Sequence, residues 1–265
     1  MKLIRTSGIA ALLMVMVASS SVYGGDLSPA ATGQVEEFRY SWRLRGGMRF
    51  VAGLVFPTSG VGNLRTSFGD TVHSELMITA PNGKQGGFYA YESEIDERGT
   101  KTLMTYHGYA WGDKSRAERT VFDYRKGQAR INKKTPDAEE NRVKKLPRGD
   151  EEYRDVLTAI YFLRQNADKV TKPIQTNIFS DGKEYPVVFR PLGQQKNFVI
   201  EGQNRAARGF EIVDAPGGKK WPGAVTVWLT TDDHRVPVRI EIKQSMASLQ
   251  LDLKKVTSPV LVARR

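Results

Sequence analysis

The sequence predicts a mainly β protein in which a strongly curved antiparallel sheet, a half-barrel or open barrel, wraps around one central α-helix. Three observations lead to this fold class. Apolar and polar residues alternate over the long stretch 38–50, which contains two glycines where a strand can bend. Further alternating segments are separated by short turns of the hairpin type. Residues 151–168 have a helical period, and their apolar surface is wider than a contact with one flat sheet requires.

The first strand is expected over residues 38–50. Its even-numbered positions carry mostly apolar side chains and its odd-numbered positions carry mostly polar ones, which predicts one buried and one solvent-facing side. Gly46 and Gly47 interrupt the alternation, so we expect a bend or a bulge there. The apolar positions are Phe38, Tyr40, Trp42, Leu44, Met48 and Phe50.

Shorter segments predict a meander in the first half of the chain and more strands after the helix. Pro81-Asn82-Gly83, residues 125–128, Gly217-Gly218 and Asp232-Asp233-His234 have the composition of turns. The expected strands are 54–56, 74–80, 87–92, 102–109, 119–124, 129–131, 185–189, 198–202, 224–231, 235–243 and 248–254.

Residues 151–168 predict the helix, with Asp150 as its N-cap and Glu151 and Glu152 at the positive end of the helix dipole. Its wide apolar surface fits a place inside the curve of the sheet, and a helix that covers one sheet face is the alternative. The preceding residues 132–151 carry many charges and few apolar side chains. They predict an exposed loop, for which a linker between two domains is the alternative.

The N-terminal residues 1–24 are typical of a cleaved secretory signal peptide. Lys2 and Arg5 precede an apolar run over 9–18, and small residues allow cleavage after Gly24. The run is shorter than the roughly 20 residues that span a bilayer, although an uncleaved N-terminal anchor is the alternative. We therefore expect a periplasmic protein with a flexible leader at 25–35, a single β-rich domain at 36–257 and a C-terminal tail at 258–265.

The amino-acid composition excludes several classes of site and favours certain classes of partner. Of the 265 residues, 40% are apolar and 26% are charged, as in a foldable globular chain. The absence of cysteine excludes disulfides, thiolate metal ligands, thiol catalysis and a lipid-modified N-terminal cysteine. The formal net charge of +11 favours anionic partners. Because the N-terminal segment predicts export, we expect lipid headgroups, acidic glycans or other proteins rather than nucleic acid.

Three stretches together resemble a known family. They are Tyr40-Ser41-Trp42 leading into Gly53-Leu54-Val55-Phe56-Pro57, the helical segment from Asp155 to Arg164, and the segment from Val227 to Ile240. Their order and spacing are similar to those of domain-of-unknown-function family 3108, an exported family of Gram-negative bacteria, over most of residues 36–255. The resemblance implies one exported β-rich domain and supplies no catalytic residues. At the level of fold analogy alone, the chain also resembles envelope lipoprotein carriers, whose half-barrels are closed by helices.

The residue types that commonly serve in catalysis and metal binding do not occur here in the spacing of a known catalytic or metal-binding motif. His73, His107 and His234 lack the spacing of metal ligands, so we expect surface roles for them and no metal. The Gly-x-Ser-x-Gly signature of hydrolases is absent, and the adjacent Asp232 and Asp233 are typical of a turn. The sequence therefore predicts a non-enzymatic protein without cofactors.

Two sets of residues are candidates for binding. An anion-binding stripe on the polar side of the first strand would consist of Arg39, Arg43, Arg45 and Arg49. The alternative is a solvated face whose arginines pair with acidic residues on neighbouring strands. A hydrophobic ligand in a cavity between sheet and helix would gain about 0.8 kcal/mol for each buried methylene. Its lining would be Trp42, Phe50, Tyr161, Phe162 and Trp228, although aromatic residues at such positions also form plain core.

The predicted function is that of a soluble periplasmic, non-enzymatic envelope protein. It binds a lipid-like or anionic envelope component and contacts the membrane at most peripherally. The alternative is a structural or protein-interaction module of the cell envelope, with a solid core and no ligand. An enzyme acting on envelope glycans or peptides is a third hypothesis, and it requires a cluster of Asp, Glu or His in a deep cleft.

Overall fold

A computed structural model of the chain describes residues 34–46, 58–80, 87–111, 114–146, 152–221, 223–243 and 248–257. The predicted signal peptide, most of the leader, the strand at 54–56, the turn at 81–83 and the C-terminal tail lie outside these residues. So do two of the candidate binding residues, Arg49 and Phe50.

Fifteen strands form one sheet in the order β8-β7-β6-β5-β4-β3-β2-β1-β15-β14-β13-β12-β11-β10-β9. The first eight are β1 (Val35–Arg45), β2 (Ser59–Phe68), β3 (Val72–Ala80), β4 (Gly87–Ile95), β5 (Thr102–Trp111), β6 (Lys114–Asp123), β7 (Gln128–Lys134) and β8 (Glu139–Lys145). The others are β9 (Tyr153–Arg154), β10 (Ile174–Ser180), β11 (Lys183–Ile200), β12 (Gln203–Asp214), β13 (Ala224–Thr230), β14 (Pro237–Lys243) and β15 (Ser248–Thr257). Neighbours pair antiparallel, apart from the parallel pair β9–β10.

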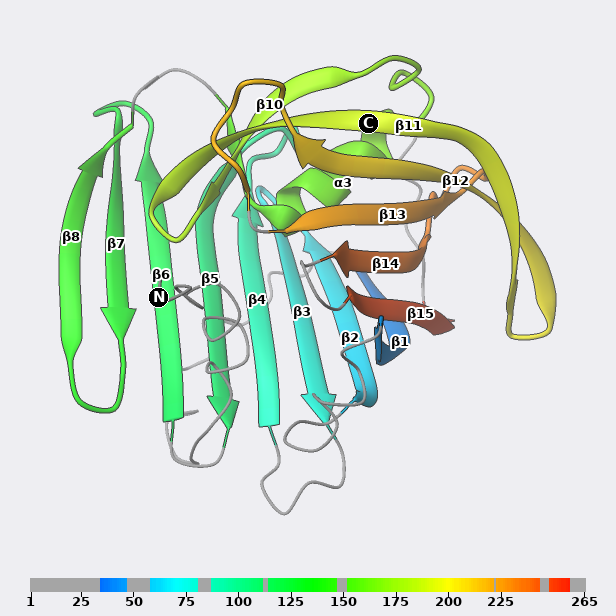
Figure 1. The fold of residues 1–265 in the computed structure, drawn as a ribbon, viewed down its shortest axis with the longest axis horizontal. Coiled ribbons are helices and arrows are strands. Elements are labelled where there is room, and N and C mark those ends of the chain that lie inside the picture. Colours follow the sequence, from blue (N-terminus) through cyan, green and yellow to red (C-terminus); the bar gives the residue numbers. More distant parts are fainter. Residues whose placement is uncertain are drawn as a thin grey trace, which may run out of the picture.

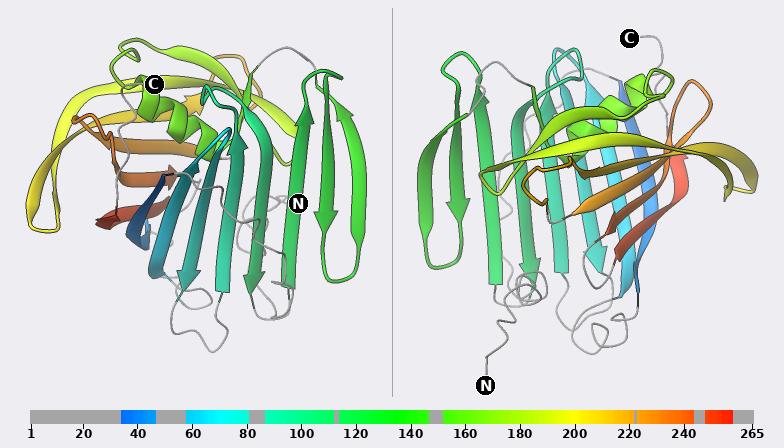
Figure 2. Two further views of the ribbon diagram at one scale, coloured as in Figure 1. Left: turned by 180° about the vertical axis from the view of Figure 1, so that it is seen from behind. Right: turned by 45° about the horizontal axis from the view of Figure 1, so that its top comes forward.

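The sheet is open and folds over on itself. Strands β1–β8 form an upright wall, and β10–β14 run crosswise over one end of it, with α3 (Val156–Asn166) between the two halves (Figure 1). The views in Figure 2 show the same arrangement from behind and from above. Because β8 and β9 are the two ends of the strand order, the sheet does not close. The predicted mainly β fold, with one helix against an open antiparallel sheet, is therefore confirmed for the described residues.

The alternation that predicted the first strand is confirmed within β1. Phe38, Tyr40 and Trp42 are buried on the face that looks toward α3, and the residues between them are more exposed. Among the described residues, β1 ends at Arg45, whereas the predicted strand extends to position 50. The next residue, Gly46, has a φ of 103°, a conformation that favours glycine and ends the regular strand.

The helix is shorter than the predicted 151–168, and Asp150 is not its N-cap. Asp155 has an extended backbone, and its carboxylate accepts a hydrogen bond from the main-chain nitrogen of Thr158 at 2.7 Å. Residues 153–154 form β9 and pair with β10, so the chain cannot enter the helix before residue 155. The sequence prediction was wrong here because pairing with a later strand, rather than local capping, sets the start.

In the segment 132–151, the described residues 132–146 belong to a hairpin and do not form the expected loop. Its residues 139–145 form β8, which pairs with β7 along its full length. Both faces of β8 are largely exposed, so no apolar alternation marks it as a strand. The alternative of a linker between two domains is also wrong, because β8 belongs to the same sheet as the other strands.

Three strands of the second half differ from the prediction. The expected strands 185–189 and 198–202 belong to one strand, β11, which has a bulge between Pro191 and Gln195 and ends at Ile200. The residues that follow, 201–202, form the turn into β12. Strands β10 and β12 were not predicted, and the exposed first residues of β12 carry no alternation.

The main core lies between the two halves of the sheet and α3. It joins the buried faces of β1–β3 to those of β11–β15, and Leu157, Ile160 and Leu163 of α3 insert between them. A second, smaller core lies where the end of β6 and the start of β7 pack against β9 and β10. It contains Phe122, Ile131, Leu146, Tyr153 and Phe179.

Candidate anion-binding site

Arg164 of the second family-like stretch and Arg235 of the third form a buried polar cluster with Glu36 at the end of α3. Arg164 donates to both carboxylate oxygens of Glu36, and the side chains of both residues are at most 2% exposed. Arg164 also donates to the carbonyl oxygen of Arg235 at 3.1 Å. Arg235 in turn donates to the carbonyl oxygens of Arg164 at 3.0 Å and Gln165 at 2.8 Å. These polar groups therefore join α3 to β1 and to the turn before β14.

The other end of α3 is held by a buried carboxylate. Asp155 caps the helix, and its second oxygen accepts a hydrogen bond from the hydroxyl of Ser93 on β4. Its main-chain nitrogen donates to the hydroxyl of Thr102 on β5 at 3.0 Å. Burial raises the pKa of Asp155, and these donors oppose that effect. Both ends of α3 are thus tied to the wall β1–β8.

The described aromatic residues that were candidates for a hydrophobic ligand are packed against other parts of the chain. Trp42 is buried and its Nε1 donates to the carbonyl of Thr79 at 2.8 Å. Tyr161 belongs to a separate small cluster with Phe68. The structure does not bring Tyr161 together with Trp42 in one lining, which fits the plain-core alternative.

The other two candidates, Phe162 and Trp228, have equally close neighbours. The ring of Phe162 lies 5.6 Å from that of Phe189, and the guanidinium of Arg154 lies over it. Trp228 is buried, and the ammonium of Lys196 lies 4.4 Å from the centre of its ring. Two hollows stand out among the described residues, and neither is lined by these aromatic residues.

The predicted arginine stripe is engaged in local pairs. Arg39 contacts Glu37 at 3.0 Å, and Arg43 contacts Asp252 on the neighbouring β15 at 3.0 Å. Arg45 donates to the side-chain oxygen of Gln250 at 3.2 Å. Arg49 lies outside the described residues. Of the described arginines, Arg43 forms the cross-strand pair with an acidic residue that the alternative predicts, whereas Arg39 pairs within its own strand and Arg45 contacts a neutral side chain.

Positive charge is concentrated instead in residues 114–146, which we call the basic flap. It consists of β6, β7 and β8 and forms one end of the sheet (Figure 1). These residues include eleven Lys and Arg against five Asp and Glu, a net charge of +6 out of +11 for the whole chain. A local excess of this size makes the flap the described region with the clearest attraction for anions.

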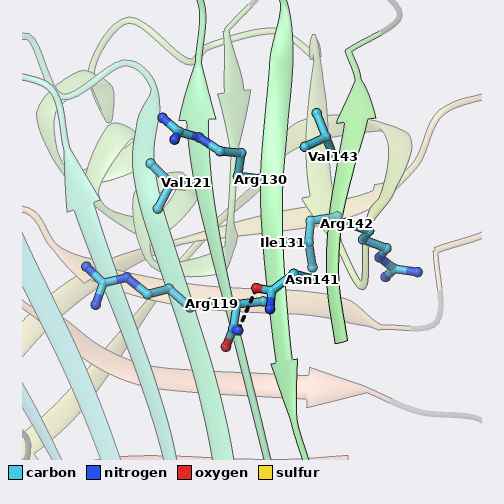
Figure 3. A pocket seen from close by; sticks show the side chains of 8 residues that line it. Arg119, Val121, Arg130, Ile131, Asn141, Arg142 and Val143 are labelled. Carbon is cyan, nitrogen blue, oxygen red and sulfur yellow. Dashed lines mark hydrogen bonds between the residues drawn. The ribbon is translucent and has the colours of Figure 1, made fainter. Parts of the chain in front are cut away.

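A groove of about 440 Å³ crosses the basic flap (Figure 3). Strand register places Val121, Arg130 and Val143 in one row across the three strands, and Arg119, Asn132 and Asn141 in the next. Asn132 donates to Asn141 at 2.8 Å and fixes the base of the groove. Ile131 and Arg142 complete the lining, and the guanidinium of Arg142 points away from those of Arg119 and Arg130 in Figure 3.

Arg119 and Arg130 are the cations best placed to meet a ligand in this groove. Both are exposed, and among the described residues neither has a carboxylate within ion-pair distance. They are diagonal neighbours on adjacent strands, a spacing of about 7–8 Å between Cα atoms. Because arginine side chains are long, two arginines at this Cα spacing can direct both guanidinium groups to one phosphate or carboxylate-bearing group.

A second cluster of polar residues lies on the opposite, inner face of the sheet. His107 of β5 and Glu118 of β6 face the tip of the β10–β11 hairpin, where Asp181 has a φ of 50°. The Nε2 atom of His107 is 3.6 Å from a carboxylate oxygen of Asp181. Burial lowers the pKa of His107, although the two nearby carboxylates act in the opposite direction.

This cluster has the residue types of a metal site, since one ligand atom from each of the three residues lies within 4.8 Å of the others. However, Arg116 already contacts Glu118 at 3.0 Å and Asp181 at 3.2 Å. Its guanidinium supplies the positive charge that a metal ion would bring, so the residues do not fit a metal. The cluster instead joins the hairpin tip to the sheet.

Comparison with known proteins addresses the family and the fold. A family model described as "Protein of unknown function (DUF3108)" matches residues 60–254. The chain belongs to the DUF3108 family. The resemblance inferred from the sequence is therefore confirmed, and no curated protein matches the chain.

Among solved structures, this DUF3108 chain is similar to the crystal structure of a "Beta-barrel-like Protein of Domain of Unknown Function DUF1849 from Brucella abortus". The TM-score is 0.56 at 11% sequence identity, and the match covers 85% of this chain and 98% of that one. This similarity concerns the fold alone and agrees with an open, barrel-like sheet. No helix among the described residues has the length and hydropathy needed to cross a bilayer.

Sequence patterns alone did not reveal the groove residues of this DUF3108 chain. The sequence predicts short strands that contain Arg119 and Arg130 but a loop over 132–151, so it does not predict that these residues share one surface. The concentration of positive charge in residues 114–146 was a usable signal.

Proposed function

We propose that the protein is an exported, non-enzymatic envelope protein that binds an anionic envelope component through the outer face of the basic flap. The observation that carries this proposal is the groove with Arg119 and Arg130, which are exposed and, among the described residues, have no carboxylate within ion-pair distance. The carboxylate of Glu139 lies at the same groove but accepts a hydrogen bond from Asn132 at 2.6 Å. Arginine is suited to phosphate and carboxylate groups because its planar fork donates two parallel hydrogen bonds. The exposed Val143 beside the groove adds an apolar contact for the same ligand.

The expected binding is weak, reversible and dependent on salt. Near an anionic surface each basic side chain contributes on the order of 1 kcal/mol, and this contribution decreases as salt shortens the Debye length. A groove open on one side favours a headgroup or an acidic glycan over a ligand that must be enclosed. The dense packing of Trp42 and Trp228 supports surface binding in preference to an internal lipid.

The proposal that the protein is not an enzyme rests on the state of its polar clusters. In the described part of the chain, the His107 cluster holds its carboxylates against Arg116, and burial favours neutral imidazole. Asp155 and Glu36 are each engaged in holding α3. None of these groups is a general base directed into a cleft, which an enzyme of envelope glycans requires.

Vesicle co-sedimentation tests the proposal with two matched pairs of arginines. Arg119→Gln/Arg130→Gln removes the groove cations, and Arg39→Gln/Arg43→Gln removes the same charge from the paired stripe. We expect the wild type to bind phosphatidylglycerol vesicles at low salt but not phosphatidylcholine vesicles. The groove variant should lose most of this binding, whereas the stripe variant should keep most of it. Equal losses in both variants, or no binding by the wild type to vesicles or acidic glycans, would overturn the proposed site.

Export is tested by the mass of the protein recovered from the periplasm of an expressing Gram-negative cell. The expected mass is that of residues 25–265, because the proposal includes cleavage after Gly24. Recovery of the full-length chain in the cytoplasm would contradict the location. Recovery of the full-length chain in the membrane fraction would favour the uncleaved anchor.

The alternative function, a protein-interaction module with a solid core, is favoured by a different observation. Strand β8 is an edge of the sheet, and in the described chain no other strand pairs with its outer side. Free edges of this kind can accept a strand from another polypeptide.

A further inference from the structure

We propose that β8 is a self-complementary edge through which two copies of this chain pair, joining their sheets into one. The two β8 strands run antiparallel and are related by a twofold axis that passes beside Arg142, normal to the sheet. This pairing does not depend on the proposed anion site, because it uses the outer edge of β8 rather than the face of the flap.

The edge formed by β8 is available for pairing. β8 is the last strand of the fifteen-stranded order and runs for seven residues from Glu139 to Lys145. It projects at the margin of the molecule in both views of Figure 2. Its side chains are nearly all exposed, including Val143 at 64%, and a strand of this length is sufficient to add to a sheet.

The main-chain groups of β8 point in the directions that such pairing needs. At the two ends of the β7–β8 ladder, Thr135 donates to Ala138 and Leu146 donates to Gly127, both at 2.8 Å. Since hydrogen-bonded and non-hydrogen-bonded pairs alternate in an antiparallel ladder, the even-numbered residues of β8 bond to β7. The odd-numbered residues therefore present their N–H and C=O groups to the free side. They are Glu139, Asn141, Val143 and Lys145.

The charge pattern of the strand, Glu-Glu-Asn-Arg-Val-Lys-Lys, is complementary to itself. Antiparallel pairing about Arg142 places Glu139 opposite Lys145 and Glu140 opposite Lys144, and the twofold axis repeats each pair. Every odd-numbered residue of one strand then faces an odd-numbered residue of the other, so all outward main-chain groups find partners. The strand thus matches itself both in charge and in hydrogen bonding.

This register is preferred over its neighbours. A shift of two residues in one direction places Arg142 opposite Lys144. A shift in the other direction places Glu140 opposite Arg142, but it pairs only residues 139–143 of the strand and leaves Lys144 and Lys145 opposite residues 138 and 137, which lie outside β8. Like charges directly opposite each other are destabilising. The central register brings the two Arg142 side chains together, but Glu140 lies diagonally beside each of them and is already 3.9 Å from Arg142 within one chain.

Charged side chains on an edge strand usually prevent pairing with unrelated strands. On β8 the same charges have a different effect, because the acidic residues are at one end and the basic residues are at the other. They oppose parallel pairing and the register that places Arg142 opposite Lys144, and the antiparallel register about Arg142 pairs the full length of the strand. A second copy of this chain is therefore the partner that the edge fits best.

Charge reversal tests the pairing in a way that separates it from misfolding. Lys145→Glu and Glu139→Lys each place like charges opposite one another in a homodimer. Mixed in equal amounts, the two variants again place opposite charges across the interface. By analytical ultracentrifugation we expect wild-type dimers, at least about tenfold weaker self-association of each variant, and recovery of dimers in the mixture.

A second pair of variants tests the hydrogen bonds. Val143→Pro removes an outward N–H without removing a bond to β7, and Val143→Thr retains that N–H. We expect V143P to be monomeric with an unchanged circular dichroism spectrum, and V143T to dimerise. A wild type that sediments as a monomer at about 100 µM, or a dimer unaffected by both K145E and V143P, would overturn the proposal.

Discussion

Arg164 and Arg235 hold each other in place, because the side chain of each donates a hydrogen bond to the main-chain carbonyl of the other. The distances are 3.1 Å from Arg164 Nε and 3.0 Å from Arg235 Nη1. Arg164 belongs to α3 and Arg235 to the turn that precedes β14. Arg164 and Arg235 each belong to one of the family-like stretches, and their contact stabilises the packing of the helix against the second half of the sheet.

The first prediction concerns the buried pair of Arg164 and Glu36. Arg164→Ala takes the guanidinium away from a carboxylate that is fully buried. Loss of one partner of such a pair costs about 3–5 kcal/mol, so we expect R164A to lower the free energy of unfolding by this order in urea titrations. Arg164→Lys should be intermediate, because lysine keeps the charge but cannot reach both carboxylate oxygens and the carbonyls together.

The control is the double variant Glu36→Leu/Arg164→Leu. Replacing both members of a buried ion pair by apolar residues costs less than removing one of them. The double variant should therefore be more stable than R164A. An R164A protein as stable as the wild type would show that this pair does not hold α3.

The second prediction concerns the backbone of Arg235, which has a φ of 45°. This left-handed conformation costs roughly 1 kcal/mol for a residue with a Cβ and nothing for glycine. Arg235→Gly and Arg235→Ala both lose the side-chain donors, so both should be less stable than the wild type. We expect the glycine variant to be about 1 kcal/mol more stable than the alanine variant. The opposite order, which is usual at regular positions, would contradict the assigned conformation.

The sequence predicted the parts of the fold in which one face of a strand is buried and the other is exposed. The alternation through Phe38, Tyr40 and Trp42 gave the orientation of β1 because those side chains are buried against the core. It did not reveal β8 or the start of β12, where both faces are exposed to solvent and apolar residues do not alternate with polar ones. It also placed the helix start at Asp150, because the pairing of β9 with β10, which delays the helix to Asp155, is not visible in the local sequence.

The candidate sites were harder to predict for a similar reason. Arg164 has the sequence features of a solvated helix residue, and its partner Glu36 is 128 positions away. The groove depends on the register of β6, β7 and β8, which places Arg119 diagonally from Arg130. Neither relationship can be read from the composition or from the spacing of residues that are close in sequence. The excess of positive charge in 114–146, in contrast, can be read from the composition.

The third prediction concerns the close contact between Gly60 and Trp42. A Cβ at Gly60 would overlap the carbonyl oxygen of Thr79 and would lie 2.6 Å from Nε1 of Trp42. Because the overlap involves backbone, Gly60→Ala must displace β2 or the indole, and we expect a loss of about 3 kcal/mol in unfolding free energy. A shift of tryptophan fluorescence in the folded state should accompany it.

The matched control for this contact is Gly202→Ala. Gly202 has a φ of 78° and open space around its Cα, so alanine there meets backbone strain but no steric overlap. We expect a smaller loss, about 1 kcal/mol, without a change in fluorescence. Equal effects of G60A and G202A would mean that the indole of Trp42 does not lie against Gly60.

The fourth prediction is a dependence of stability on pH that arises from His107. Burial lowers the pKa of His107 in the folded protein, and this effect exceeds the opposing attraction of Glu118 and Asp181. In the unfolded chain the pKa of histidine is about 6.5. As the pH falls below that value, the unfolded chain takes up a proton that the folded protein resists, so the free energy of unfolding decreases. The decrease ends at the folded pKa and is limited to about 1.4 kcal/mol per pH unit.

His107→Gln removes this titration and keeps a polar side chain beside Asp181. We expect the difference in unfolding free energy between the wild type and H107Q to become less favourable to the wild type as the pH falls from about 7 to about 5. Urea titrations at several pH values in this range measure it, and His73→Gln, which changes a histidine outside the cluster, is the matched control. If the difference between the wild type and H107Q is constant across this range, the imidazole is not kept neutral by burial, and the hairpin tip at Asp181 does not cover it.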